Sequence, residues 1–216
     1  MAFGLPIPAH VELFVGAALA LLLIPGPAVL YLVGRSIEYG RTAGFVSILG
    51  IHTATLVHVA AAAWGLSAIL ASSALAFALV TYAGAAYLIW LGVMKVLGPA
   101  DPIAVAAPGN PRSHADLFRE GFVVNLLNPK TALFFLAFLP QFVDPESGQA
   151  AAQFVVLGVI YTLLDLATDG AYALAAGAAG TWLRRSRAYL GFERYVSGGL
   201  LIGLGLSAAV SGARRG

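Results

Sequence analysis

The sequence predicts an all-α polytopic membrane protein with six transmembrane helices, and three observations lead to that fold class. Hydrophobic residues make up 60% of the 216 positions and charged residues only 10%, with a mean hydropathy of +0.87. Soluble domains carry about a quarter charged residues, so a chain this apolar needs lipid as its solvent. Apolar runs of the length that crosses a bilayer, about 20 residues, recur along the chain. Two of these runs are broken by proline.

The six apolar runs divide the chain into two halves. They are predicted at 12–33, 44–70, 74–97, 119–142, 150–182 and 195–211. The stretch from Gly98 to Leu117 carries four prolines among polar residues, which is typical of a linker. We therefore expect one membrane domain with a first three-helix repeat (1–97), a cytoplasmic linker (98–117) and a second three-helix repeat (118–216).

The proline breaks fall in the first and fourth runs, at Pro25-Gly26-Pro27 and at Asn128-Pro129. Proline removes a helix hydrogen bond, and in lipid the freed backbone groups must face protein or a water-filled cavity. Because each half has three spans, the second half crosses the membrane in the opposite sense to the first. Paired interruptions in two inverted repeats are typical of the substrate site of a secondary transporter.

The basic residues predict the orientation. Nine of the Lys and Arg residues fall on one side and two on the other, and short basic loops remain cytoplasmic. The larger group is Arg35, Arg41, Lys95, Arg112, Arg119, Arg184, Arg185, Arg187 and Arg194, and the smaller is Arg214 and Arg215. Both termini are therefore expected in the periplasm. These short clusters do not form a nucleic-acid surface, and the absence of cysteine excludes disulfides and thiolate metal sites.

The fifth run carries a polar seam. Its members are Tyr161, Asp165, Thr168, Asp169 and Tyr172, whose spacing places them on one helix face, with Val159, Leu163, Leu166 and Ala173 expected opposite. Two carboxylates four residues apart repel when both are ionised, which favours binding of a proton or a cation. In the alternative interpretation, the two acids only hydrogen-bond neighbouring helices.

The second run holds His52, Thr53, Thr55 and His58. Six residues of helix turn the two histidines about 120° apart, so they do not share a metal ion, and no metal site is predicted. We expect Thr55 at the substrate site and His58 in proton coupling. The alternative for each histidine is a packed ring bonded to a backbone carbonyl.

The fourth run opens with Asn125, Asn128, Pro129 and Lys130. Lys130 and the backbone amides freed at a helix start form a positive site that suits a carboxylate. The alternative for Lys130 is snorkelling toward the membrane surface. In the first run, the amides after Pro27 are free in the same way and Gly26 permits close approach, although a plain kink is the competing interpretation.

These candidates form two predicted sets. Substrate binding is assigned to Pro25, Gly26, Pro27, Thr55, Asn125, Asn128, Pro129, Lys130, Tyr161 and Tyr172. Proton coupling is assigned to Asp165, Asp169 and His58.

The motifs together resemble the LysE/RhtB family of amino-acid exporters. The resemblance covers the whole chain and is carried by the stretches 24–27, 40–44, 82–88, 125–130 and 135–142. It implies a six-helix protein of the bacterial inner membrane, without cofactors, which expels amino acids or close derivatives with the proton gradient and forms a homodimer. Family members often carry an acidic residue in the second span where this chain has Thr55.

The sequence therefore predicts a proton-coupled exporter of small zwitterions, not an enzyme. Lys130 and the first break would hold the substrate carboxylate, while Asp165 and Asp169 take its amine and the proton. The alternative is an exporter of metal or other small cations, but a divalent site needs more ligands than two acids and one histidine. An intramembrane enzyme is disfavoured because the chain lacks the Gly-x-Ser-Gly and Gly-x-Gly-Asp contexts of such proteases.

Overall fold

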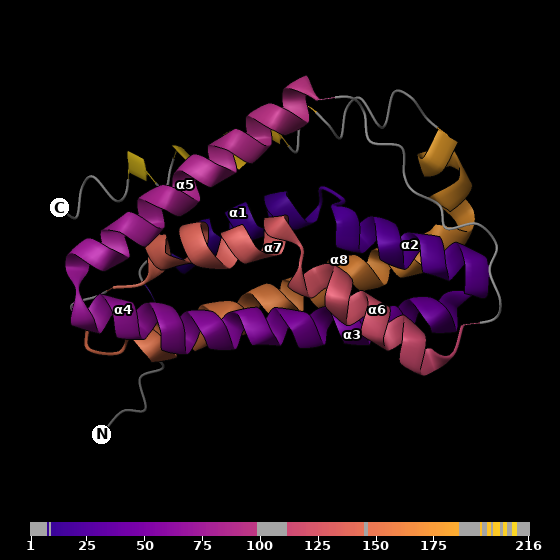
Figure 1. The fold of residues 1–216 in the computed structure, drawn as a ribbon. Coiled ribbons are helices and arrows are strands. Elements are labelled where there is room, and N and C mark those ends of the chain that lie inside the picture. The colour runs from indigo at the N-terminus through magenta and orange to yellow at the C-terminus, as the bar shows by residue number, and fades with distance from the viewer. Residues whose placement is uncertain are drawn as a thin grey trace.

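The computed structural model describes Pro8, residues 10–98, 112–144 and 147–185, and scattered residues between 195 and 210. Every regular element in these ranges is a helix, which confirms the all-α class for this part of the chain (Figure 1). Much of the predicted linker and of the predicted sixth span lies outside the described residues.

The first and fourth predicted spans are bent helix pairs. The first consists of α1 (Val11–Leu22) and α2 (Pro27–Tyr39), which meet at 52°. The fourth consists of α6 (His114–Leu126) and α7 (Pro129–Leu133), followed by a π-helical turn (Phe134–Phe138) and a 3-10 turn (Leu139–Phe142), with a bend of 47°. In both pairs a proline opens the second helix, where its missing N–H costs no hydrogen bond.

The other spans are long single helices. The second is α3 (Arg41–Ala61), which continues through a π-helical turn (Ala62–Leu66) into α4 (Ser67–Ser72). The third is α5 (Ala74–Leu97), whose start is capped by the Ser73 hydroxyl, and the fifth is α8 (Ala150–Arg185). By length and composition, 41–69 and 150–176 can each cross a membrane, and each bent pair adds one more if it counts as one span. The six spans and their inverted repeats remain predictions.

The helix of the predicted fourth span begins before the apolar run. The linker is predicted to end at residue 117 and the span to begin at 119, and α6 begins at His114. Ser113 and Asp116 form a capping box there, because the Ser113 hydroxyl accepts from the Asp116 N–H at 3.1 Å and the Asp116 carboxylate accepts from the Ser113 N–H at 3.3 Å. The charged first turns of α6 therefore extend the helix beyond its apolar run.

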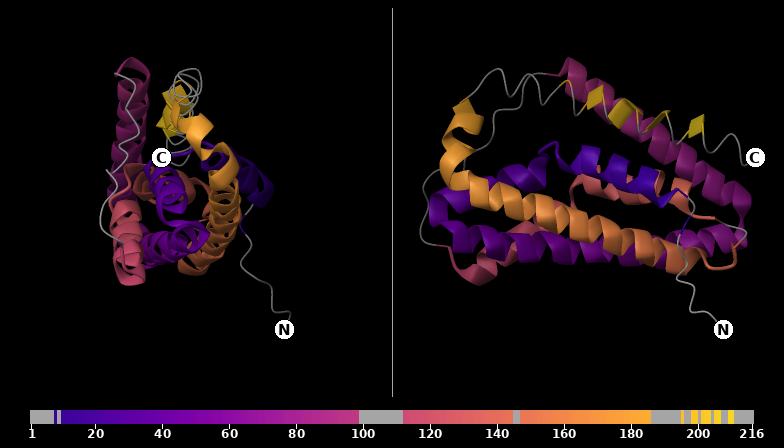
Figure 2. Two further views of the ribbon diagram at one scale, coloured as in Figure 1. Left: turned by 90° about the vertical axis from the view of Figure 1, so that its right-hand side faces the viewer. Right: turned by 180° about the vertical axis from the view of Figure 1, so that it is seen from behind.

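The helix α3 lies at the centre of the arrangement that positions the site. It packs against α6, where Gly50 faces the backbone of Phe118 and Gly121 faces the carbonyl of Ser47. On its other side α8 runs antiparallel to α3 along the length of the bundle (Figure 2). Glycine permits such close approach because it has no Cβ.

Charged side chains gather at one end of the bundle, where α2 ends and α3 and α6 begin (Figure 1). Arg35 pairs with Glu38 at 2.9 Å and with Glu120 at 3.0 Å, and Arg112 pairs with Glu120 at 3.3 Å. These arginines belong to the set predicted on the cytoplasmic side.

Candidate functional site

The two proline breaks lie against each other. The Lys130 ammonium, one residue after Pro129, donates to the carbonyl of Ile24 at 2.5 Å. A Cβ built on Gly26 would lie 3.1 Å from Lys130 Cδ, so the lysine stem crosses directly over the first break. Segments more than a hundred residues apart in the chain therefore form one site.

The first break exposes carbonyl groups at the end of α1, and side chains from the second half of the chain bond to them. Lys130 takes the Ile24 carbonyl, and the Tyr172 hydroxyl donates to the Leu23 carbonyl at 2.8 Å. The last carbonyls of a helix have no partner within it, and its C-terminus favours a cation. Two residues predicted to bind substrate thus also cap the broken helix, a role that the sequence analysis did not include.

The second break is held by a buried polar network on Asn125. Its side-chain amide donates to the Ile51 carbonyl and to the Thr55 hydroxyl, both at 2.9 Å, and its side-chain oxygen accepts from the Thr131 hydroxyl at 2.9 Å. Asn128 caps α7 by accepting from the Lys130 N–H at 3.1 Å. Each of these four polar side chains is at most 5% exposed. The network fixes the fourth span to α3.

His58 belongs to this second break and not to the acidic cluster. Its Nε2 lies 3.4 Å from the Asn125 carbonyl, and its ring stacks on Phe135 with centroids 5.9 Å apart. This is the packed, carbonyl-bonded arrangement given above as the alternative for each histidine. The predicted part of His58 in proton coupling has no geometric support from the two acids.

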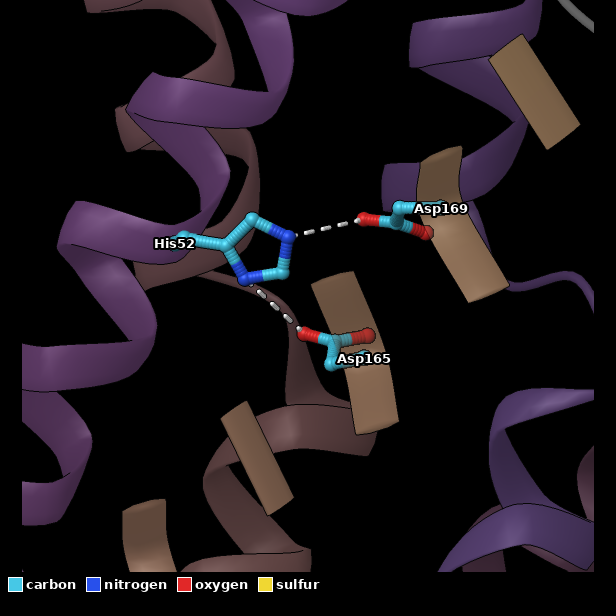
Figure 3. Close-up of side chains that lie close together, drawn as sticks. All are labelled: His52, Asp165 and Asp169. Atoms are coloured by element: carbon cyan, nitrogen blue, oxygen red, sulfur yellow. Dashed lines mark ion pairs between the residues drawn. The ribbon is translucent and has the colours of Figure 1, made fainter. Parts of the chain in front are cut away.

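The histidine that meets the acids is His52. Its Nδ1 lies 3.6 Å from Asp165 Oδ2 and its Nε2 lies 3.7 Å from Asp169 Oδ2, so the ring stands between the two carboxylates (Figure 3). All three residues are buried, at 8% exposed or less. The sequence shows only that His52 lies on an inward face of its helix, because Ile48, Ile51, His52, Thr55 and Val59 recur at helical spacing and form one buried face of α3.

Several polar atoms of this cluster have no hydrogen-bond partner among the described residues. They are His52 Nδ1, His52 Nε2 and Asp169 Oδ2. The nitrogen–oxygen distances exceed the usual 2.7–3.2 Å range of such a bond. Buried polar groups are nearly always paired, so three unpaired atoms in one cluster mark a site where something else binds or where the side chains close together.

The remaining seam of α8 is partly as predicted. Tyr161 is buried among aromatic rings, 4.4 Å from the Phe134 centroid and 5.1 Å from that of Phe135. Val159, Leu163 and Leu166 face outward as expected, at 45%, 60% and 46% exposed. The placement of Ala173 opposite the seam is wrong, because it is 1% exposed and faces Gly44. It follows Asp169 by one helical turn and so shares its face.

Lys130 links the first break to the acids, because it bonds the Ile24 carbonyl and its charge acts on both carboxylates. Its ammonium interacts electrostatically with both Asp165 and Asp169. A buried site therefore combines one fixed cation, two acids and a titratable imidazole, together with the open backbone of two helix breaks. That combination suits a small molecule that carries both charges.

The same three residues could also hold a cation. His52, Asp165 and Asp169 each offer one ligand atom, and these atoms all lie within 4.8 Å of one another. Two ligands of one tetrahedral ion, each about 2.1 Å from it, lie about 3.4 Å apart. The two ring nitrogens also face different acids, so a single ion can meet only one of them. An imidazole placed between two acids is better suited to protons.

The family model for the LysE type translocator matches residues 19–212. The homoserine/homoserine lactone efflux protein of Salmonella typhimurium is 34% identical over 162 residues, which cover 75% of this chain and 78% of that protein. An uncharacterized membrane protein of Vibrio cholerae is 31% identical over 189 residues, 88% of this chain and 91% of that protein. The leucine efflux protein of Enterobacter sp. is 27% identical over 152 residues, 70% and 72% of the two chains.

No solved structure matches the chain. The family match extends from the first break to the last predicted span, and so includes every residue of the site described above. The chain is a helical membrane protein that belongs to the LysE type translocator family.

Proposed function

We propose that this protein is a secondary transporter that exports amino acids or close derivatives across the bacterial inner membrane in exchange for protons. The names of its relatives, homoserine and leucine efflux proteins, support an amino-acid substrate. The observation that carries the proposal is the meeting of two helix breaks beside a buried pair of acids. Irregular backbone at membrane depth is tolerated where it lines a cavity, and paired breaks are typical of transporter sites.

The site matches the two charges of an amino acid. The substrate carboxylate would bind Lys130 and the backbone N–H groups that follow Pro27. The lysine ammonium has three donor hydrogens, and one of them already meets the Ile24 carbonyl. The substrate amine would lie toward Asp165 and Asp169, with which the Lys130 charge interacts.

Proton coupling follows from competition for the acids. Two carboxylates in a low-dielectric site are unfavourable when both are charged, so a proton or the substrate ammonium stabilises them. Release of the amine outside would leave the acids ready to take a proton, and release of that proton inside would restore them for the next substrate. Such alternation gives export driven by proton entry.

The proposed assembly completes this cycle. Six spans in two inverted repeats, with both termini in the periplasm, would allow the halves to rock around the shared site. The clustering of Arg35, Arg112 and Glu120 where α2 meets α6 supports a common cytoplasmic end. We propose a homodimer on the resemblance to the family alone.

The experiment is an efflux assay in cells loaded with single amino acids from dipeptides. The protein should lower the internal concentration of its substrates and protect cells from toxic analogues. Asp169→Asn should abolish this, because the amide neither binds a proton nor holds an ammonium. Glu12→Gln, a change of the same kind at an exposed position in α1, is the matched control and should export normally. Full export by Asp169→Asn at equal membrane abundance would refute the proposal.

A further inference from the structure

We infer that His52 is a proton-carrying residue of this transporter, which bridges Asp165 and Asp169 so that the three side chains hold one proton between them. The inference rests on the proposed function and extends it, because it adds a residue of α3 to the pair of acids on α8.

The placement of the ring carries the argument. Asp165 and Asp169 lie one turn apart on α8, and the imidazole of His52 stands between them with one nitrogen toward each (Figure 3). A neutral imidazole has one N–H donor and one acceptor nitrogen. It can therefore pair with both acids only if the acid that faces its acceptor nitrogen carries a proton and donates to the ring.

Counting hydrogens shows which state is satisfied. With both acids ionised and the ring neutral, one ring nitrogen presents its lone pair to a carboxylate, which is repulsive. With one added proton, every facing pair has a donor and an acceptor. The unpaired state of both ring nitrogens and of Asp169 Oδ2 fits a cluster that the added proton would complete.

The distances between the ring nitrogens and the carboxylate oxygens fit direct hydrogen bonds after a small movement. The two separations, 3.6 and 3.7 Å, are too short for a bridging water, which needs about 4.5 Å or more between the groups it joins. They exceed a hydrogen bond by only about half an ångström. A small shift of α8 against α3 would therefore open or close the triad.

The triad also allows a proton to move. Asp165 gives its proton to Nδ1 of His52 while Nε2 gives its own proton to the Asp169 carboxylate, and the ring ends as the other tautomer. The reverse sequence moves the proton back. One proton is transferred, no charge is created, and no further reactant is needed.

Other charged and titratable groups lie around the triad on several helices. From α7, Lys130 acts on both acids, and from α8, Tyr161 acts on both while Tyr172 acts on Asp169. In the described parts of α2 and α6, Arg35 pairs with Glu38 and with Glu120 at the end of the bundle. His58 of α3 lies at the second break.

The test compares proton-driven transport with exchange in proteoliposomes, with radiolabelled leucine and homoserine as probes. In His52→Gln, transport driven by a pH gradient should fall about tenfold, within the usual range of coupling between linked sites. Exchange without a gradient should remain within about twofold, and its pH dependence should flatten. A protein with merely damaged packing would lose both activities together.

His114→Gln is the matched control, because His114 is exposed at the start of α6 and should change neither activity. Unchanged gradient-driven transport and an unchanged pH profile in His52→Gln would overturn the inference and leave the exporter intact. If the wild-type protein moved neither amino acid, the proposed function would fail instead.

Infrared titration of the purified wild-type protein tests the triad directly. It depends neither on transport activity nor on whether His52→Gln folds. The carboxylic acid band, assigned with Asp165→Asn and Asp169→Asn, and the imidazole ring bands should change together in one pH step. Independent titration of the ring and the acids would overturn the inference. So would a wild-type protein whose bands respond to Zn²⁺ but not to pH.

Discussion

Gly26 makes room for Lys130. A Cβ on Gly26 would lie 3.1 Å from Lys130 Cδ and 3.6 Å from its Nζ, while that Nζ bonds the Ile24 carbonyl just before the same break. The backbone of Gly26 is extended, with φ −100°, so any residue can adopt it. Glycine is therefore required here for space and not for its backbone freedom. The two breaks fit together because one lacks a side chain and the other supplies a long one.

A larger side chain at position 26 should displace Lys130 further. Gly26→Ala needs only a small shift of a flexible lysine stem, so the variant should fold and keep part of its transport. Gly26→Leu occupies the position of the lysine and should abolish transport, at a stability cost of about 1–3 kcal/mol for the lost bond to Ile24. Efflux and thermal unfolding in detergent measure the two effects.

The control for this series is Gly34→Ala in α2. A Cβ on Gly34 meets nothing within 4 Å, and alanine favours a helix over glycine by about 0.5–1 kcal/mol. This variant should transport normally and unfold slightly later. Wild-type transport by Gly26→Leu would contradict a role for the Lys130 position.

The contact between α3 and α6 predicts a severe effect at Gly50. A Cβ there would overlap the carbonyl oxygen of Phe118 and lie 2.9 Å from the Phe122 nitrogen, and backbone atoms cannot move aside as a side chain can. Gly50→Ala should cost about 1–3 kcal/mol by overpacking and lower the yield of folded protein. Gly16→Ala, with nothing within 4 Å, should have no such effect. Equal melting temperatures for the two variants would show that the helices are not this close.

Asn125 should contribute strongly to stability through its buried hydrogen bonds. Its side chain bonds the Ile51 carbonyl, Thr55 and Thr131, and all are buried. Asn125→Ala leaves these partners unpaired, and interhelical bonds in membranes contribute about 0.6–2 kcal/mol each. We expect a clear drop in the unfolding temperature. Thr53→Ala, whose hydroxyl bonds only its own helix and is exposed, should leave that temperature unchanged.

The sequence predicted the elements better than their contacts. The break at Pro25-Gly26-Pro27, the break at Pro129 and the inward face of Asp165 and Asp169 all follow from local chemistry or from helical period, and the structure has them. Ser113 and Asp116, which form a capping box, also mark the start of α6 in the sequence. The apolar run alone begins later and misses the first turns of this helix.

The sequence does not predict that His52 is the residue of α3 that contacts Asp165 and Asp169. Which residue of α3 meets α8 depends on the rotation and depth of two packed helices, and those depend on the close approach of α3 to α6 at Gly50. The helical period shows that His52 and His58 point in different directions, but it does not say which of them faces Asp165. The capping of the Leu23 and Ile24 carbonyls by Tyr172 and Lys130 likewise appears only when distant segments are brought together.

The ion pair between Arg35 and Glu120 joins α2 of the first half to α6 of the second. Glu120 accepts from Arg35 at 3.0 Å and from the Tyr31 hydroxyl at 3.3 Å, while Arg35 lies over the Tyr31 ring, 5.2 Å from its centroid. Partly exposed pairs contribute only about 0–1 kcal/mol to stability. That amount is small for folding, but it is enough to change the balance between two conformations of similar free energy.

Breaking this pair should therefore open this end of the bundle without unfolding it. The chain has no cysteine, so a single Ser47→Cys, at a fully buried position in α3, reports access to a thiol reagent. Arg35→Gln or Glu120→Gln should raise the labelling rate about two- to fivefold, as the loss of up to about 1 kcal/mol allows. The exchanged pair Arg35→Glu with Glu120→Arg should partly restore protection, and Arg41→Gln, an exposed arginine at the start of α3, should leave the rate unchanged. If both amide variants label at the wild-type rate, the pair does not hold α2 to α6, and the closure of this end must come from packing alone.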